Sequence, residues 1–210
     1  MSSSKKRPFR PEEFSTPQTR HIRLTCCADT TLWFIVDFLD LSAGQARDGN
    51  DGAAVRGRID WPRRCALMRH HTLLHIVNAV VLTRYGGLIT GVQIGEEKSR
   101  IDFRLEGFDR DRVAELETRI NEVIGRDLAV DAGVIDEAEF HARPELVRTA
   151  VVGPPVVDGR VRVVTIDGFD AQACGGTHVR STGELGACTI LRTENKGKNN
   201  KRLYLTLTTC

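Results

Sequence analysis

A long apolar segment in the first half of the chain constrains the fold more than any other feature. Residues 65–85, CALMRHHTLLHIVNAVVLTRY, carry apolar side chains at the three- and four-residue spacing of a helix. Gly86 and Gly87 follow at once, and glycine is the residue that most often ends a helix. The segment therefore predicts one long helix that begins after Pro62 and ends before Gly86.

Shorter segments with other patterns follow this helix. Residues 99–107, SRIDFRLEG, alternate like a strand and place Ile101, Phe103 and Leu105 on one face. Residues 109–127 predict an amphipathic helix that ends at Gly125. Its apolar stripe consists of Val113, Leu116, Ile120, Val123 and Ile124.

Several more elements are expected toward the C-terminus. The segments that read as strands are residues 127–135, 160–169, 186–194 and 202–209. Residues 136–148 read as a short helical segment broken at Pro144. Helices and strands that mix without regular βαβ alternation favour an α+β fold over a doubly wound sheet.

The N-terminal part of the chain differs in composition from the rest. Residues 1–19 are rich in Ser, Pro and charge, which predicts a disordered tail. Residues 20–60 combine β-rich runs with the turn-like SAGQARDGNDGAA and predict a small, shortened β-rich module. Residues 61–210 are then expected to form a domain of mixed helices and antiparallel sheet.

Composition bounds the class of protein. A hydrophobic content of 40% and a charged content of 28% are ordinary for a globular chain, and the net charge of +2 does not by itself indicate nucleic acid. We expect no membrane partner, because no apolar run approaches the roughly 18 residues that span a bilayer. The six cysteines show no disulfide framework spacing, which favours a reducing, cytoplasmic location.

Three histidines lie at the start of the predicted long helix. Residues four apart on a helix share a face, with Cβ atoms about 5–6 Å apart. His71 and His75 therefore form a pair, and His70 points elsewhere. Two such imidazoles can hold one Zn²⁺ at about 2.0–2.1 Å. For this spacing alone, a helix face with two unconnected histidines is the more common alternative.

A second candidate pair follows about a hundred residues later. Cys174 and His178 in QACGGTHV are also four apart, but Gly175 and Gly176 predict a tight loop instead of a helix. Such a loop can turn a thiolate and an imidazole toward one point and aim backbone N–H groups at a ligand. A structural cysteine beside a capping histidine is the alternative.

The two pairs together supply four suitable zinc ligands. Four protein ligands are typical of a closed structural site, so coordination alone does not indicate catalysis. A zincin is excluded because Thr72, not Glu, follows His71.

Two segments resemble the signature segments of the alanyl-tRNA synthetase editing domain, and most closely its free-standing relatives, the AlaX-type trans-editing proteins. They are IDWPRRCALMRHHTLLH (59–75) and FDAQACGGTHVRSTGELG (169–186). GVQIGEEKSRIDF and NKGKNNKRLYL are similar to two further family segments, and the resemblance covers about residues 56–208. The related editing domain of threonyl-tRNA synthetase shares the metal pattern, but IDW, CGGTHV and TGELG favour the alanyl side.

The resemblance implies a zinc-dependent hydrolase that removes serine, and also glycine, from mischarged tRNA(Ala). By position, the family's zinc ligands correspond to His71, His75, Cys174 and His178. Thr72 matches the threonine that reads the serine hydroxyl, and Gln93 lies near a glutamine implicated in editing. A site that reads a hydroxyl is useful because a pocket that admits alanine excludes serine only about 10²-fold. A Thr72 hydroxyl that satisfies its own helix backbone is the alternative.

Basic residues lie close to both signature segments. In the closing turn and strand they are Lys196, Lys198, Lys201 and Arg202, and near the histidines they are Arg63, Arg64 and Arg69. We expect these side chains to contact acceptor-stem phosphates. A solvated basic turn is the usual alternative, and only the family context favours RNA contacts.

One departure from the family pattern bears on selectivity. Longer AlaX proteins carry a glycine-rich segment similar to GGGQP in an N-terminal barrel, and residues 42–49, SAGQARDG, are at best a decayed version of it. Strict rejection of correctly charged alanyl-tRNA is therefore in doubt. An RNA-binding module with a structural zinc and a small-molecule hydrolase that reuses the site stay open as other functions. The sequence does not indicate an oligomeric state.

Overall fold

A computed structural model describes most of the chain from Ile59 onward. The described ranges are 20–22, 39–41, 59–105, 109–149, 154–197 and 199–208. The strands β1 (Arg20–Ile22) and β2 (Leu39–Leu41) pair antiparallel and fall in segments whose composition predicts strands. The predicted tail, the glycine-containing segment at 42–49 and most of the predicted module at 20–60 lie outside the described residues. From Pro62 onward the chain belongs to one compact unit.

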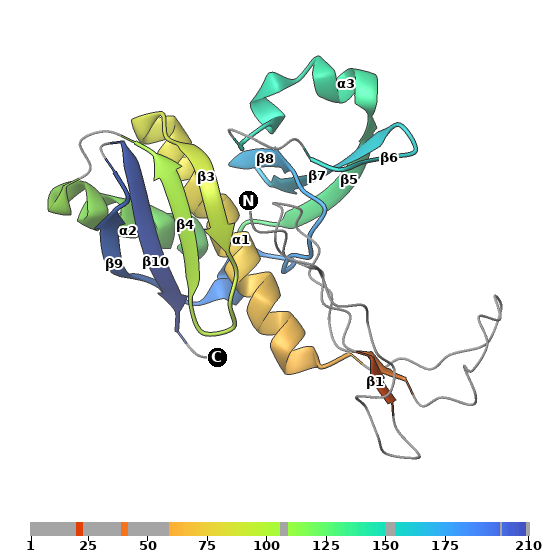
Figure 1. The fold of residues 1–210 in the computed structure, drawn as a ribbon, viewed down its shortest axis with the longest axis horizontal. Coiled ribbons are helices and arrows are strands. Elements are labelled where there is room, and N and C mark those ends of the chain that lie inside the picture. Colours follow the sequence, from red (N-terminus) through yellow and green to blue (C-terminus); the bar gives the residue numbers. More distant parts are fainter. Residues whose placement is uncertain are drawn as a thin grey trace, which may run out of the picture. The chain divides into compact units, whose positions relative to one another are not determined.

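The predicted long helix is confirmed as α1 (Trp61–Tyr85), which runs through the core (Figure 1). It begins two residues earlier than expected, because Pro62 lies in the first turn, where its missing N–H leaves no hydrogen bond unmade. It ends at Tyr85, just before Gly86, whose φ of 68° is readily adopted only by glycine. Every residue from His70 to Val81 is buried, so this middle part of α1 is enclosed on all sides.

The burial of α1 distinguishes a core helix from a membrane-spanning one. Contrary to the expectation from sequence, α1 is long and apolar enough to cross a membrane by length and composition. However, 72% of the apolar window is buried inside the protein. Its buried side chains, among them Leu73, Ile76 and Val80, belong to the main hydrophobic core. We therefore interpret α1 as the central core helix of this unit.

A four-stranded antiparallel sheet packs against α1. Its strands are β3 (Leu88–Gln93), β4 (Ser99–Arg104), β9 (Cys188–Asn195) and β10 (Asn200–Leu207), in the order β3-β4-β10-β9. The helix α2 (Arg110–Gly125) also contributes to this core, through Leu116, Ile120, Val123 and Ile124 of the predicted stripe. Ile101, Phe103 and Leu105 are buried on one face, as predicted.

A second, smaller sheet holds the loop that carries Cys174 and His178. Its elements are β5 (Val130–Asp136), β6 (Val156–Val157), β7 (Arg160–Ile166) and β8 (Asp170–Ala173), with β7 pairing to all three others. Between β5 and β6 lie α3 (Glu137–His141) and a 3₁₀ turn, η2 (Pro144–Leu146), and another 3₁₀ turn, η3 (Thr182–Leu185), precedes β9. Helices combined with antiparallel sheets confirm the α+β class.

Candidate metal centre

The four predicted metal ligands lie together in the structure. His71 and His75 come from neighbouring turns of α1, and Cys174 and His178 come from the loop that follows β8. One donor atom from each residue lies within 4.8 Å of the other three. His71 and Cys174 are only 2% and 4% exposed, so the donors converge in the interior.

The two distances from the sulfur donor to imidazole nitrogens suit zinc. The Sγ atom of Cys174 lies 3.4 Å from Nε2 of His71 and 3.5 Å from Nε2 of His178. A tetrahedral ion with Zn–S and Zn–N bonds of about 2.3 and 2.0–2.1 Å holds its sulfur and nitrogen ligands roughly 3.6 Å apart. The donor set of three imidazoles and one thiolate also matches the ligands that zinc prefers. The residues therefore fit the ion that the sequence predicts.

The glycines of the loop allow its close approach to α1. A Cβ atom on Gly176 would lie 2.2 Å from Cε1 of His71, so no larger residue fits without movement of the loop or the imidazole. Arg162 on β7 holds the same loop, because its guanidinium donates to the carbonyl oxygens of Cys174 at 2.8 Å and Gly176 at 2.6 Å. The small glycines therefore let the loop pack close to α1, and the hydrogen bonds from Arg162 on β7 hold it there.

The far ring nitrogens of two histidines have partners of their own. Nδ1 of His71 lies 3.1 Å from the carbonyl oxygen of Thr177, to which it donates when it carries the proton. Nδ1 of His178 lies 3.0 Å from the hydroxyl oxygen of Thr72. A partner on one nitrogen fixes the tautomer and orientation of the ring, which leaves the other nitrogen free for a metal.

Thr72 is enclosed beside this centre. It is completely buried, and its hydroxyl also accepts from the backbone N–H of Val179 at 3.3 Å. When Nε2 of His178 faces a metal, Nδ1 carries the proton and donates to Thr72, so both acceptor positions of the hydroxyl are filled. This arrangement orients His178. The role in reading a serine hydroxyl, predicted from the resemblance, stays a prediction.

Burial shifts the ionisation of the whole cluster toward neutral forms. It lowers the pKa of His71 to about 4, although the Thr177 carbonyl opposes the shift and the positive charge of Arg162 adds to it. It also lowers the pKa values of His75 and His178 well below their usual range. Burial raises the pKa of the Cys174 thiol to about 11, against the effects of the Gly176 N–H and Arg162. The imidazoles are thus ready to bind a cation, whereas the thiol must lose its proton.

A pocket opens beside the cluster and is lined by His71, His75 and Cys174. Its walls are mostly apolar and consist of Leu74, Ile89, Val92, Ile101, Leu146, Val147, Pro154, Pro155, Ala173 and Gly175. Its remaining polar lining comes from Arg148, Thr149 and Gln172. Apolar walls with a few convergent polar groups are typical of sites that bind small molecules or small chemical groups.

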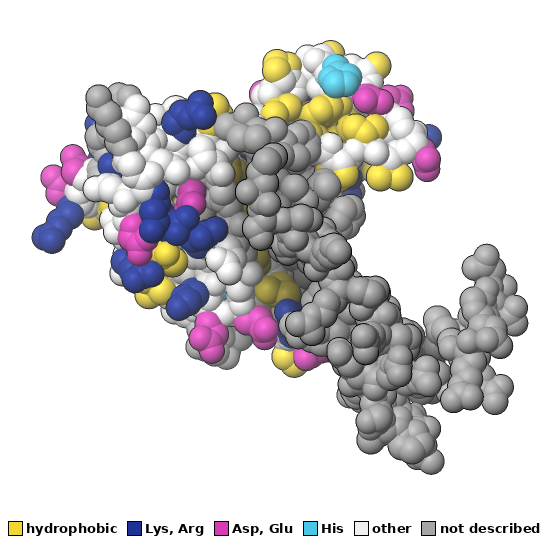
Figure 2. Space-filling view, viewed as in Figure 1, with side chains coloured by type: hydrophobic (Ala, Val, Ile, Leu, Met, Phe, Trp, Pro, Cys, Tyr) yellow, Lys and Arg dark blue, Asp and Glu magenta, His cyan; other side chains and the backbone are white. Residues whose placement is uncertain are grey.

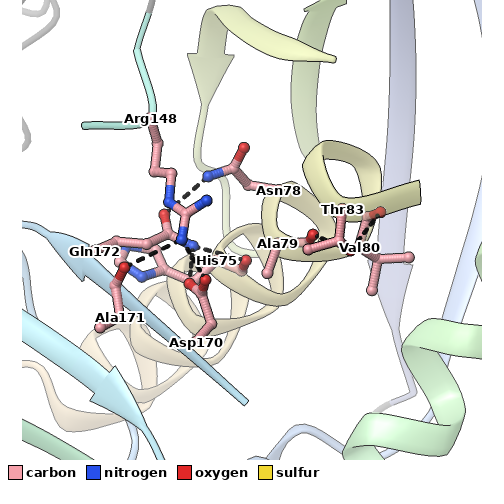
Figure 3. Close-up of polar contacts among 9 residues, drawn as sticks. All are labelled: His75, Asn78, Ala79, Val80, Thr83, Arg148, Asp170, Ala171 and Gln172. Atoms are coloured by element: carbon pink, nitrogen blue, oxygen red, sulfur yellow. Dashed lines mark hydrogen bonds and ion pairs between the residues drawn. The ribbon is translucent and has the colours of Figure 1, made fainter. Parts of the chain in front are cut away.

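A polar network, drawn in Figure 3, joins α1 to β8 next to this pocket. Gln172 donates from Nε2 to the His75 carbonyl oxygen at 3.0 Å and to Asp170 at 2.6 Å, and its Oε1 accepts from Asn78 at 2.9 Å. Arg148 donates to the other oxygen of Asp170 at 2.5 Å. The network thereby fastens the turn that carries His75 to the strand that leads to Cys174.

Sequence reasoning did not single out these network residues or Arg162. Asp170 and Gln172 alternate on β8 just before Cys174, and this alternation was the available signal. Arg148 and Arg162 could not be found from a local pattern. Their partners, Asp170 and Cys174, lie 22 and 12 residues further along the chain, and only the folded loops bring them together.

Gln93 lies apart from the pocket. It is the last residue of β3, its side chain is exposed, and it does not belong to the pocket lining. Its neighbour Val92 lines the pocket, and successive side chains of a strand point to opposite faces. The catalytic role expected for Gln93 stays a prediction.

Most of the basic residues expected to contact RNA have partners within the protein. Arg69 donates to the carbonyl oxygens of Glu184 at 3.0 Å, Leu185 at 2.5 Å and Thr208 at 2.8 Å. The other pairs are Arg202 with Asp102, Lys196 with Glu194, Lys201 with Asn195 and Arg63 with Glu96. Lys198 lies outside the described residues. These residues stay predictions as RNA contacts, and Arg69 in addition ties α1 to the end of the chain.

Known proteins are similar in sequence to most of this chain. Residues 161–204 match the family model described as the threonyl and alanyl tRNA synthetase second additional domain. The chain is 42% identical over 156 residues to an alanyl-tRNA editing protein AlaX-M of Methanosarcina acetivorans, which covers 74% of this chain and 64% of that protein. It is 40% identical over 158 residues to AlaX-M of Saccharolobus solfataricus, covering 75% of this chain and 66% of that protein.

A longer enzyme is also similar. An alanine–tRNA ligase of Methanococcus maripaludis is 33% identical over 156 residues, which cover 73% of this chain but 17% of the ligase. The chain therefore spans slightly less than two thirds of the AlaX-M proteins and a small part of the ligase.

Proposed function

Because this chain belongs to the AlaX family of alanyl-tRNA editing proteins, we propose that it is a zinc-dependent hydrolase that deacylates mischarged tRNA(Ala) in trans. The proposed substrates are seryl-tRNA(Ala) and glycyl-tRNA(Ala), and the proposed location is the cytoplasm. The observation that carries the proposal is the convergence of four zinc-type donors within 4.8 Å beside a pocket.

His71, His75, Cys174 and His178 would hold the zinc ion. A bound zinc ion can polarise an ester carbonyl or lower the pKa of a water molecule. The apolar walls would enclose a small aminoacyl group and exclude bulk water, which strengthens polar interactions inside the pocket. Gln172 and Arg148 would hold the His75 turn in place while substrate binds.

Selection of serine over alanine needs a group that hydrogen-bonds the serine hydroxyl. We propose Thr72 for this role, through the one hydroxyl proton that remains after it accepts from His178 and Val179. Correct alanyl-tRNA would leave that partner unmatched, at a cost of about 1–3 kcal/mol. Gln93 stays a predicted second catalytic residue, but its exposed side chain lies at the end of β3 on the face opposite the pocket.

The test is deacylation of defined substrates by purified protein of known zinc content. Seryl-, glycyl- and alanyl-tRNA(Ala) are incubated separately with the protein and with His75→Ala, and the loss of each ester is followed. We expect rapid loss of serine and glycine, and no loss with the variant, because the variant lacks one metal ligand. Loss of the alanine ester as well would still identify the protein as a deacylase. It would also indicate that rejection of alanyl-tRNA(Ala) depends on the glycine-rich segment of the longer AlaX proteins.

The same experiment distinguishes the alternatives. No hydrolysis with stoichiometric zinc would favour an RNA-binding module with a structural metal. Hydrolysis of seryl-tRNA(Thr) in preference to seryl-tRNA(Ala) would indicate a threonyl-type editing domain. Equal hydrolysis of a serine ester that lacks tRNA would indicate a small-molecule hydrolase.

A further inference from the structure

The outward face of the β3-β4-β10-β9 sheet carries a dense set of basic side chains. Leu203 and Leu205 of β10 point into the core, so Arg202 and Tyr204 point outward. The register places Arg202 opposite Asp102 and Glu194, and Tyr204 opposite Arg100 and Arg192. We define the basic sheet face as Arg100, Asp102, Arg104, Arg192, Glu194, Lys196, Arg202 and Tyr204.

The charges of this face do not cancel. Asp102 accepts from Arg202 at 2.8 and 2.7 Å and lies 3.9 Å from Arg100. Glu194 lies 3.2 Å from Arg192 and 3.0 Å from Lys196. Each carboxylate is thus shared by two cations, and the exposed Arg104 adds a fifth. Figure 2 shows Lys and Arg side chains gathered over the region where Figure 1 shows β4 and β10. The surplus of positive charge complements a polyanion.

One aromatic side chain lies among the cations. The guanidinium of Arg192 is stacked over the ring of Tyr204, with its central carbon 4.1 Å from the ring centroid. The side chain of Arg192 is 62% exposed, so its outer face is open to a partner. Stacked arginine and tyrosine side chains are suited to the sugars and bases of nucleic acids as well as to their phosphates.

The basic sheet face and the pocket lie on opposite sides of the same edge strand. In β3, Gln93 pairs with Arg100 and faces outward with it, whereas Val92 pairs with Ile101 and lines the pocket. Near Ile89 the edge of β3 is bridged to Thr149, so a nucleic-acid strand from the basic sheet face would cross β3 at its Val92–Gln93 end to reach the metal centre.

We propose that the basic sheet face binds the sugar–phosphate backbone of the tRNA acceptor arm and directs its aminoacylated 3′ end across β3 into the pocket. The proposal rests on the proposed function, which makes tRNA the substrate. It assigns the phosphate contacts mainly to Arg104, Arg192 and Lys196. Arg69 is not part of this face, and its guanidinium donates to three backbone carbonyl oxygens of the protein.

The test reverses charge on the face in the full-length, zinc-containing protein. The variant is Arg104→Glu/Arg192→Glu, and its neutral counterpart is Arg104→Gln/Arg192→Gln. The control is Arg110→Glu/Arg126→Glu, which makes the same charge change at exposed positions at the two ends of α2. Two quantities are measured: kcat/KM for seryl-tRNA(Ala) relative to 3′-O-seryl-adenosine, and the affinity for uncharged tRNA(Ala) at several salt concentrations.

We expect the reversed variant to lower the ratio of the two kcat/KM values at least tenfold and to weaken tRNA binding by a similar factor. Its slope of log affinity against log salt should fall by about one to two units, since each lost phosphate contact contributes roughly 0.7–0.9. The neutral variant should show a smaller loss in the same direction, and the control should keep the wild-type ratio and slope.

Equal losses in the control, or an unchanged ratio and slope in the reversed variant, would overturn the proposal. If the wild-type protein hydrolyses neither ester, the proposed function fails. The binding measurement then still tests whether the basic sheet face binds tRNA. Loss of tRNA binding confined to the face variants supports the face, and equal binding by all variants refutes it.

Discussion

The hydroxyl oxygen of Thr72 lies 3.0 Å from Nδ1 of His178, across 106 positions of sequence. This contact joins α1 to the loop after β8 and turns Nε2 of His178 toward Cys174. Thr72 thus belongs to the support of the metal centre as much as to any recognition of substrate.

Replacement of Thr72 by Val should therefore weaken zinc binding. The methyl group keeps the volume but removes the acceptor for His178 and Val179, and loss of such a partner typically costs about 10–100-fold in metal affinity. Zinc affinity measured by competition with a chromophoric chelator checks this expectation. Thr72→Ser keeps the hydroxyl and should bind zinc within a few-fold of wild type. Wild-type affinity in Thr72→Val would show that the contact does not orient His178.

Gly176→Ala should disrupt the centre by steric contact alone. The added methyl group would lie 2.2 Å from Cε1 of His71, so the loop or the imidazole must move. We expect zinc stoichiometry to fall well below one per chain, measured by elemental analysis after gel filtration. Gly133→Ala is the matched control, because an added Cβ there meets nothing within 4 Å. Full zinc occupancy in both variants would contradict the prediction.

Replacing Arg148 and replacing Asp170 should have effects on the free energy of unfolding that do not add, because the two side chains form an ion pair. The two side chains are 12% and 7% exposed, and Arg148→Met leaves the carboxylate of Asp170 buried without its cation. Loss of one partner of such a pair costs roughly 3–5 kcal/mol in the free energy of unfolding. Adding Asp170→Asn removes the uncompensated charge and should recover about 1–3 kcal/mol of this loss. Urea unfolding of both single variants and the double variant measures the coupling, and additive losses would refute it.

The metal-free protein should lose stability as the pH falls from about 6.5 to about 4. Burial lowers the pKa of His71 from 6.5 to about 4, so within this window the unfolded chain takes up a proton that the folded chain does not. The loss from this one group approaches roughly 3 kcal/mol at the lower end. The lowered pKa values of His75 and His178 act in the same direction.

Urea unfolding in the presence of a chelator, repeated between pH 7.5 and pH 4.5, tests this dependence. His71→Gln/His75→Gln/His178→Gln removes the three titrating imidazoles and should flatten the profile. An equally steep profile in this variant would assign the acid sensitivity to other groups.

The sequence by itself determined the elements whose signals are local. The spacing of apolar residues and the glycine at 86 define α1, and the helix period alone places His71 and His75 on one face. The glycines at 175 and 176 correctly indicate a loop between β8 and η3. These predictions succeed because helix geometry and glycine's freedom depend on a few neighbouring residues.

Only the tertiary structure decided which distant groups meet. Arg69 reads as a free basic residue in sequence, yet its partners are carbonyl oxygens of Glu184, Leu185 and Thr208. The β3–β4 register sends Gln93 to the basic sheet face, while Val92 enters the pocket. Such outcomes depend on strand order and register and, for Arg69, on loop closure between segments 115 to 139 residues apart. No local pattern encodes them, because backbone carbonyls and buried partners have no sequence signature of their own.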